Sequence, residues 1–165
     1  MRAVTFQEVG EVRVEDVARP AVSEPQDALV RVTVGAICGS DLHIYHGHSP
    51  VDRGAVLGHE FVGVVEEVGA GVRSVRPGDR VVAAFYTACG RCRLCRRGWW
   101  SQCESRAIFG HGTYFGGLGG GQAERCVVPN ADLNLMRVPD GVADEQAVFV
   151  GDILATGYFR SEERV

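Results

Sequence analysis

The sequence lacks any long apolar run. Its hydrophobic residues make up 45% of 165 positions, but they are divided among short segments. None of these approaches the roughly 20 consecutive apolar residues that a membrane-spanning helix needs. Residues 1–8 turn polar within a few positions, which is not the pattern of a signal peptide. We therefore expect a chain without a membrane segment, located in the cytoplasm.

An excess of positive charge is also missing. The chain carries 17 basic and 21 acidic residues, for a net charge of −4. Nucleic acids and anionic membrane surfaces are bound by basic patches, so neither is expected as a partner. A length of 165 residues with 23% charged residues is typical of one globular domain.

A dinucleotide-binding fingerprint is absent as well. The richest glycine stretch, Gly110–Gly121, contains no G-x-G-x-x-G. It also lacks the strand, turn and helix that must surround such a fingerprint. We expect the Rossmann domain that cradles a dinucleotide to be absent from this chain.

The cysteines do not suggest a disulfide framework. Nothing in the sequence indicates export, and thiols stay reduced in the cytoplasm. Four of the six cysteines lie within fifteen residues, at Cys89, Cys92, Cys95 and Cys103. Crowding of this kind indicates metal binding more than disulfide bonding.

What is present is mainly β pattern. Valines occupy every second position of 28–34, the period of a half-buried strand. Similar short apolar segments occur at 2–6, 12–14, 61–69, 80–85 and 122–129. Pro77-Gly78 predicts a turn before 80–85, while 109–121 is expected to be irregular and the composition becomes helical from Asp144. The pattern predicts a compact β barrel or sandwich with helices at its end.

The four clustered cysteines have the spacing C-x2-C-x2-C-x7-C. Short gaps let one turn aim consecutive sulfurs at an ion about 2.3 Å away, and the longer gap returns the fourth. Unligated cysteines or an iron–sulfur cluster would share this spacing, but it favours zinc. Because four sulfurs leave no open position for a substrate, the predicted zinc is structural.

A second set of metal-ligating residues follows two predicted strands. Cys38 lies just after the 28–34 segment and His59 just before the 61–69 segment. Thiolate and imidazole are a pair that zinc favours, and Asp41 could accept a hydrogen bond from the His59 ring. From the residues alone, a metal site and ordinary packing remain equally open. Three further histidines are expected to be mobile loop residues rather than ligands: His46, His48 and His111.

These motifs resemble the zinc-dependent alcohol dehydrogenases of the medium-chain dehydrogenase/reductase superfamily. The resemblance rests on 58–72, which is similar to the zinc signature, on 38–43, on the cysteine loop and on 120–124. It covers essentially the whole chain. It implies that residues 1–150 form a GroES-like β barrel with short helices and a structural zinc lobe at 88–104. Residues 151–165 would begin the helix leading to a nucleotide-binding domain that this chain lacks.

The resemblance also implies a ligand set for a catalytic zinc. Cys38 and His59 match the first two ligands, and Asp152 occupies the place of the third. Glu60 matches an alternative ligand for the open position. Because adjacent residues of a plain strand face opposite sides, Glu60 would need a local bend to reach the metal.

The same resemblance assigns catalytic and cofactor contacts. Ser40 matches the hydroxyl that hydrogen-bonds the substrate alcohol, and His43 matches the next group of a proton relay near the cofactor ribose. Gly39 and Thr156 match residues near the cofactor. The implied enzyme uses two Zn²⁺ per chain and NAD or NADP, acts on small alcohols or aldehydes, and in its full-length form is a homo-oligomer.

Two other interpretations compete with the enzyme. A zinc-binding structural module could use the same barrel without chemistry, and its mark would be a single zinc in the cysteine loop. A zinc ribbon that binds nucleic acid would use the arginines of that loop, but the acidic chain and the lack of interleaved aromatics oppose it. The chain alone is expected to be inactive because nothing in it holds the dinucleotide.

Overall fold

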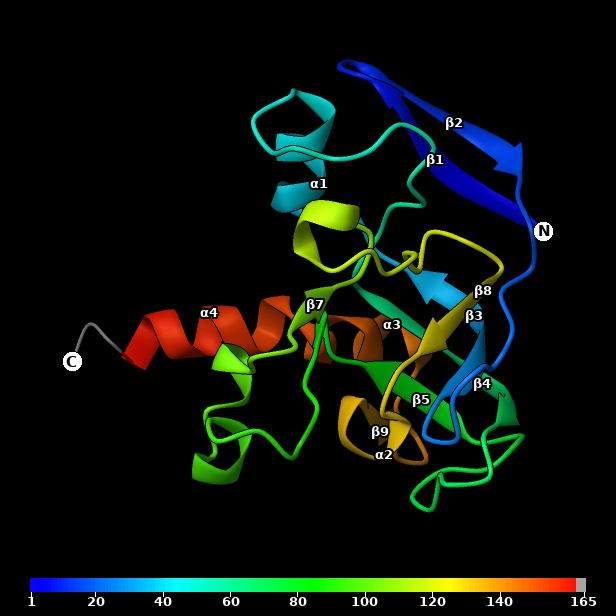
Figure 1. Cartoon of the computed structure of the whole chain (residues 1–165), viewed down its shortest axis with the longest axis vertical. Helices are drawn as coiled ribbons and strands as arrows, with labels where there is room; N and C mark the ends of the chain where they lie inside the picture. The colour runs from blue at the N-terminus through cyan, green and yellow to red at the C-terminus, as the bar shows by residue number, and fades with distance from the viewer. Residues whose placement is uncertain (163–165) are drawn as a thin grey trace.

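A computed structural model describes residues 1–162, and these form mainly antiparallel strands joined by turns and short helices (Figure 1). The strands are β1 (Arg2–Glu8), β2 (Glu11–Asp16), β3 (Ala28–Gly35), β4 (Phe61–Val68), β5 (Arg80–Ala83), β6 (Tyr86–Thr87), β7 (Ala107–Ile108), β8 (Arg125–Val128) and β9 (Leu135–Arg137). The helices are α1 (Gly39–Tyr45), α2 (Ala131–Asn134), α3 (Asp144–Ala147) and α4 (Ile153–Glu162), with 3-10 turns η1 (Cys95–Arg97), η2 (Trp100–Gln102), η3 (Thr113–Phe115) and η4 (Val148–Gly151).

The largest sheet has five antiparallel strands in the order β8-β3-β4-β5-β9. Its centre is the pair of valine-rich strands that the sequence predicted, β3 and β4. Ala28, Leu29 and Val30 are fully buried, because here β3 is covered on both faces. Two register shifts between β3 and β4 bend the pair, as bulges do.

The expected mainly β fold is confirmed, but the sheets do not close into a continuous barrel. Across residues 1–162, β1 pairs with β2 and β6 pairs with β7 in two further small sheets. Outside its own two-stranded sheet, β1 forms isolated bridges rather than a ladder, Ala3 with Ala123 and Thr5 with Val56. The segments beside β1 are too irregular for continuous pairing, so they contribute single hydrogen bonds instead of a ladder.

The hydrophobic core fixes the two segments that matter most for the site. Phe61 and Phe109 are 1% and 0% exposed, and their rings meet edge to face with centroids 5.3 Å apart. Burying a phenylalanine side chain contributes about 2 to 3 kcal/mol. This contact holds the glycine-rich segment after β7 against the start of β4.

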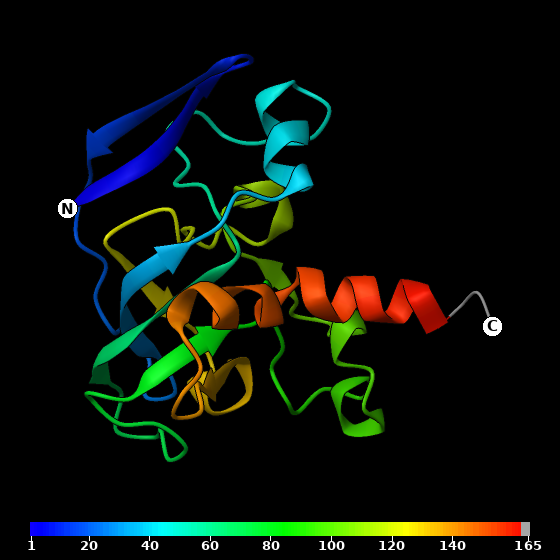
Figure 2. The same ribbon diagram turned by 180° about the vertical axis from the view of Figure 1, so that it is seen from behind.

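The predicted C-terminal helix is interrupted. α3 and η4 pack on the central sheet and cover one face of it (Figure 2), after which the chain bends at Asp152, just beyond Gly151. A Cβ at Gly151 would lie 2.4 Å from the Ala83 carbonyl oxygen, so only glycine fits this approach. The bend places Asp152 beside the end of β5.

Beyond the bend, α4 has no buried residue and projects away from the sheets (Figure 1), leaving the two ends of the described chain on opposite sides of the molecule. The division of the chain at residue 150 stays a prediction, and residues 163–165 of the expected helix lie outside the described residues. No helix within residues 1–162 combines the length and apolar character needed to cross a bilayer.

Candidate metal centres and active site

The cysteine lobe brings four sulfurs together. Cys89, Cys92, Cys95 and Cys103 are free thiols whose sulfur atoms all lie within 4.8 Å of one another. The short turns η1 and η2 supply the curvature, and Gly98 ends η1 in the left-handed conformation. The two-residue gaps therefore turn the sulfurs inward, as the spacing predicted.

Backbone amides surround these sulfurs. The amides of Cys89 and Ser105 donate to the Cys103 sulfur at 3.3 Å, and the amide of Cys95 donates to the Cys92 sulfur at 3.4 Å. Amide hydrogen bonds lower the pKa of Cys92 to about 6, whereas burial and the neighbouring sulfurs raise the pKa of Cys95 to about 12. At this spacing all four sulfurs could be thiolates only with a cation between them, so the donor set fits zinc.

A second cluster joins three distant segments. Cys38, His59, Glu60 and Asp152 each offer one ligand atom, and these atoms lie within 4.8 Å of one another. Cys38 precedes α1, the His59–Glu60 pair precedes β4, and Asp152 lies between η4 and α4. The structure thus brings together every residue predicted to ligate the catalytic metal.

A local bend explains how two adjacent residues share one cluster. The chain bends at His59, before β4 begins at Phe61, so Glu60 is not in a plain strand. Gly58 prepares this bend with a φ of +95°, and a Cβ there would lie 2.6 Å from the Gln122 backbone nitrogen. The positive φ and the close approach to Gln122 each require glycine at position 58.

Helix α1 was not predicted from the sequence. It begins directly after Cys38 and carries Ser40 and Asp41, the two residues that face His59. Its first turn is held by Asp41, whose Oδ2 accepts a hydrogen bond from the Cys38 amide at 2.8 Å. Carboxylates at this position stabilise helix starts. The helix directs Ser40 toward His59, with 3.2 Å between Ser40 Oγ and His59 Nε2.

The two ring nitrogens of His59 face different partners. Nε2 lies 3.6 Å from Asp152 Oδ2, and Nδ1 lies 3.6 Å from Asp41 Oδ1, as expected for an acceptor behind a ligand histidine. Burial by itself lowers the pKa of His59, but the Asp41 carboxylate and the Cys38 sulfur outweigh it and raise the pKa to about 9. The site therefore favours a positive charge at the position of this ring.

Unsatisfied polar atoms concentrate at this cluster. Within residues 1–162, the buried side-chain atoms without a hydrogen-bond partner are Asp41 Oδ1, His59 Nδ1 and Glu60 Oε1. Burial and the charge of Asp152 raise the pKa of Glu60. Buried polar atoms usually have partners. A cation held by sulfur, nitrogen and carboxylate oxygen would relieve this accumulation of negative groups, so the residues fit zinc.

A cavity of about 490 Å³ adjoins the cluster. Its lining residues are Ser40, His43, His48, Ser49, Ile108, His111 and Phe115. The predicted relay residues Ser40 and His43 thus face one cavity. Gly39 and Thr156 do not line it; the Thr156 hydroxyl instead donates to Asp152 Oδ1 at 2.8 Å.

Like His46 and His48, His111 does not belong to the ligand cluster, but its interpretation as a mobile loop residue did not anticipate its burial. This residue lies in a loop, but it is 7% exposed and its ring meets the His59 ring edge to face, with centroids 5.1 Å apart. Its Nδ1 is 2.9 Å from the Phe109 carbonyl oxygen. No local sequence pattern marks it, because only the packing of Phe109 brings the loop to the cluster. His46 and His48 are exposed, and neither belongs to the cluster.

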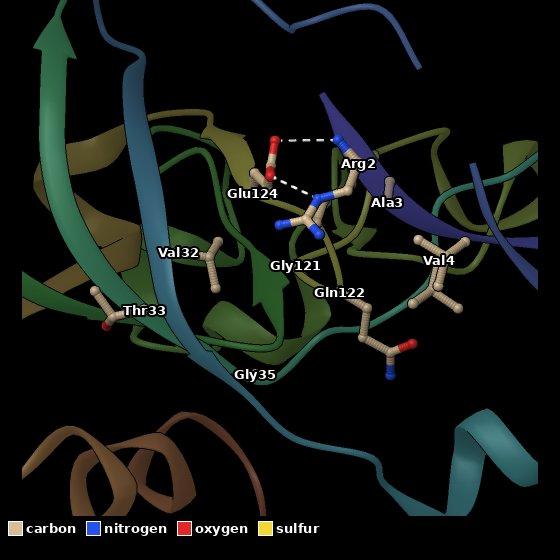
Figure 3. A pocket seen from close by; sticks show the side chains of 11 residues that line it. Arg2, Ala3, Val4, Val32, Thr33, Gly35, Gly121, Gln122 and Glu124 are labelled. Atoms are coloured by element: carbon tan, nitrogen blue, oxygen red, sulfur yellow. Dashed lines mark hydrogen bonds and ion pairs between the residues drawn. The ribbon is translucent and has the colours of Figure 1, made fainter. Parts of the chain in front are cut away.

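Another hollow, of about 360 Å³, lies between β1, β3 and the segment 121–124 (Figure 3). Arg2 and Glu124 close one side of it, where Arg2 Nε lies 3.0 Å from Glu124 Oε1. The clustered ligands line neither hollow, but Ser40 and His111 of the first cavity contact His59 directly. The chemistry therefore points to the cavity beside His59.

Comparison with known proteins places this geometry in a family. Residues 24–140 match the family described as "Alcohol dehydrogenase GroES-like domain". The chain is 45% identical over 159 residues to zinc-type alcohol dehydrogenase B of Aspergillus flavus, covering 96% of this chain and 36% of that protein.

Solved structures of alcohol dehydrogenases have the same fold over most of this chain. An alcohol dehydrogenase from Thermus sp. ATN1 superposes with a TM-score of 0.94 at 51% identity, covering 96% of this chain and 46% of that one. Zinc-dependent alcohol dehydrogenase 2 from Streptococcus pneumonia superposes with a TM-score of 0.83 at 40% identity, covering 96% and 43%. The chain therefore spans less than half the length of these relatives. Through its GroES-like domain, it belongs to the zinc-type alcohol dehydrogenases of the medium-chain dehydrogenase/reductase superfamily.

Proposed function

We propose that this chain is the zinc-binding catalytic region of an enzyme that interconverts small alcohols with aldehydes or ketones, using a nicotinamide cofactor. The observation that carries the proposal is the convergence of Cys38, His59, Glu60 and Asp152 beside the cavity that Ser40 and His43 line. Membership of the zinc-type alcohol dehydrogenases supports it, since zinc and a nicotinamide are what that family implies.

Cys38, His59 and Asp152 would hold the catalytic zinc, and Glu60 would be the alternative ligand at the open position. A zinc bound there supplies a Lewis acid that lowers the pKa of a nearby hydroxyl. Asp41 lies behind His59, with its Oδ1 3.6 Å from Nδ1, and would favour a proton on that nitrogen when Nε2 acts as a ligand. The open position and the neighbouring cavity are what distinguish this site from a structural one.

Ser40 and His43 would move the substrate proton. Ser40 Oγ lies 3.2 Å from His59 Nε2, so its hydroxyl is beside the cluster and can accept the proton that a substrate hydroxyl releases. His43 lines the same cavity and is exposed, so it can pass the proton to solvent. Ile108 and Phe115 give the cavity an apolar wall that limits competing water.

The cysteine lobe would hold a second, structural zinc, giving two ions per chain. Gly39 and Thr156 would lie near the nicotinamide end of NAD or NADP. The G-x-G-x-x-G fingerprint is not in this sequence and the relatives are more than twice as long. We therefore propose that the cradle for the pyrophosphate lies outside residues 1–165, and that the full-length protein is a homo-oligomer.

The test is turnover by the full-length protein. We expect reduced cofactor to accumulate with small primary or secondary alcohols. We expect Ser40→Ala to lower kcat about 100-fold and Ser40→Thr to restore most of it. Elemental analysis should find two zinc ions per chain, and one in the Cys38→Ser variant. A single zinc in the unmodified protein, with no turnover of any alcohol, would favour the non-catalytic zinc module instead.

A further inference from the structure

His111 is a buried polar side chain in the cavity to which the proposed chemistry assigns no task. It is 7% exposed, and it lines the same cavity as Ser40 and His43. A buried imidazole usually serves either to hold the local backbone or to face a ligand. The hydrogen bonds of its two ring nitrogens separate these roles.

One ring nitrogen is fully committed. Nδ1 lies 2.9 Å from the Phe109 carbonyl oxygen, and a carbonyl only accepts, so Nδ1 carries the proton and donates it. In the neutral imidazole, Nε2 is then a bare acceptor. The carbonyl that accepts this hydrogen bond is held in place, because Phe109 is fully buried and packs edge to face on Phe61.

Packing also fixes the plane of the ring. His59 lies on one side, with its ring centroid 5.1 Å away, and Phe115 on another, at 5.6 Å. Both contacts are edge to face, and together with the hydrogen bond to Phe109 they hold the ring in this orientation. Because His111 lines the cavity and its Nδ1 is bound to Phe109, we take Nε2 as the ring nitrogen that faces the cavity.

We propose that Nε2 of His111 accepts a hydrogen bond from a second hydroxyl group of the substrate. The preferred substrates are then alcohols with a hydroxyl on a neighbouring carbon, such as vicinal diols and polyols. This inference rests on the proposed alcohol oxidation, in which Ser40 handles the reacting hydroxyl. His111 is close to the same cluster through His59, so a hydroxyl on the adjacent carbon suits it better than a remote one.

Two substitutions separate substrate recognition from support of the loop. Asparagine places its side-chain amide near the position of Nδ1, so His111→Asn keeps a donor for Phe109 and removes the acceptor. Glutamine places its amide near the position of Nε2, so His111→Gln keeps an acceptor and loses the bond to Phe109. His46→Asn is the matched control, since His46 is exposed and does not line the cavity.

The experiment compares kcat/KM for 1,2-propanediol and 1-propanol, measured on the full-length, zinc-loaded protein. We expect the unmodified protein and His46→Asn to prefer the diol. We expect His111→Asn to lower the diol-to-propanol ratio about tenfold, the effect of one lost hydrogen bond, and His111→Gln to keep the ratio within about twofold.

Three results would overturn the inference while leaving the proposed function intact. They are equal turnover of both alcohols by the unmodified protein, an unchanged ratio in His111→Asn, and a ratio lost only in His111→Gln. If the unmodified protein oxidises no alcohol at all, the proposed function fails and the inference fails with it. Zinc content and melting temperature of each variant identify any loss that comes from folding.

Discussion

At the scale of single residues, the bend that puts His59 and Glu60 into one cluster depends on Gly58. Its φ of +95° lies in the left-handed region, and a Cβ there would meet the Gln122 backbone at 2.6 Å. Gly78 has nearly the same φ, +93°, but nothing lies within 4 Å of its added Cβ. Substitution of Gly78 would therefore cost backbone strain alone, whereas substitution of Gly58 would cost both strain and steric overlap.

We predict that Gly58→Ala lowers the free energy of unfolding by about 3 kcal/mol or more, because strain and overlap add. Gly78→Ala should lower it by only about 1 kcal/mol, the cost of strain alone. Denaturant melts of both variants measure the two costs. Equal destabilisation would mean that the crowding at Gly58 relaxes freely.

At the scale of elements, the site is assembled by segments anchored to the central sheet. α3 is tied to that sheet by Asp144, which accepts hydrogen bonds from Thr33 Oγ1 and from Arg80 Nη2, each at 2.6 Å. η4 and Asp152 follow directly after α3. Asp144 therefore supports the position of the third candidate ligand through the packing of α3 and η4.

The Asp144 contacts predict how stability depends on pH. The Thr33 hydrogen bond, together with Arg80, holds the pKa of Asp144 below its ordinary value of 3.8. A carboxyl whose pKa is lowered by folding stabilises the protein above pH 3.8, and this contribution is lost as pH falls through the lowered value. We predict that Asp144→Asn costs about 1 kcal/mol or less at pH 7, since Arg80 is 37% exposed and partly screened.

The measurement is the difference in unfolding free energy between the variant and the unmodified protein at pH 7, pH 5 and pH 3.5. The difference should be constant from pH 7 to pH 5 and should begin to shrink below pH 3.8. Protonation of other groups cancels, because it affects both proteins. A difference that grows on acidification would contradict the assigned direction of the pKa.

At the scale of the whole molecule, the two metal centres differ in how their ligands are held. The four cysteines come from one loop of fifteen residues, whereas the other cluster joins Cys38, His59 and Asp152 across the fold. Opening of any of those three segments would release one ligand. The cysteine lobe opens only if its own turns come apart.

We predict that a chelator removes zinc in two phases, with the ion at Cys38 leaving first. Elemental analysis at timed intervals follows the loss, and Cys38→Ser should lack the fast phase while keeping the slow one. Loss of both ions at one common rate would refute the difference between the sites.

Local sequence was sufficient for much of this protein. Alternation in 28–34, with the period of two that marks a strand, and a run of β-branched residues in 61–69 predicted the two central strands. The spacing of Cys89, Cys92, Cys95 and Cys103 predicted a cluster, because ligands this close in the chain need only turns to meet. The composition of residues 39–45 did not predict a helix. Only the structure shows α1, in which the Asp41 carboxylate stabilises the first turn.

Tertiary structure decided what joins distant segments. The sequence placed Asp152 in a ligand position only by resemblance; its approach to His59 depends on the close packing of Gly151 against β5 and on the bend that follows. His111 carried no local signal at all, and it reaches the cavity because Phe109 packs on Phe61. The expected barrel stayed open because the segments beside β1 pair by single bridges. Sequence by itself determines contacts whose partners are near in the chain, whereas contacts between distant residues exist only once the core has brought them together.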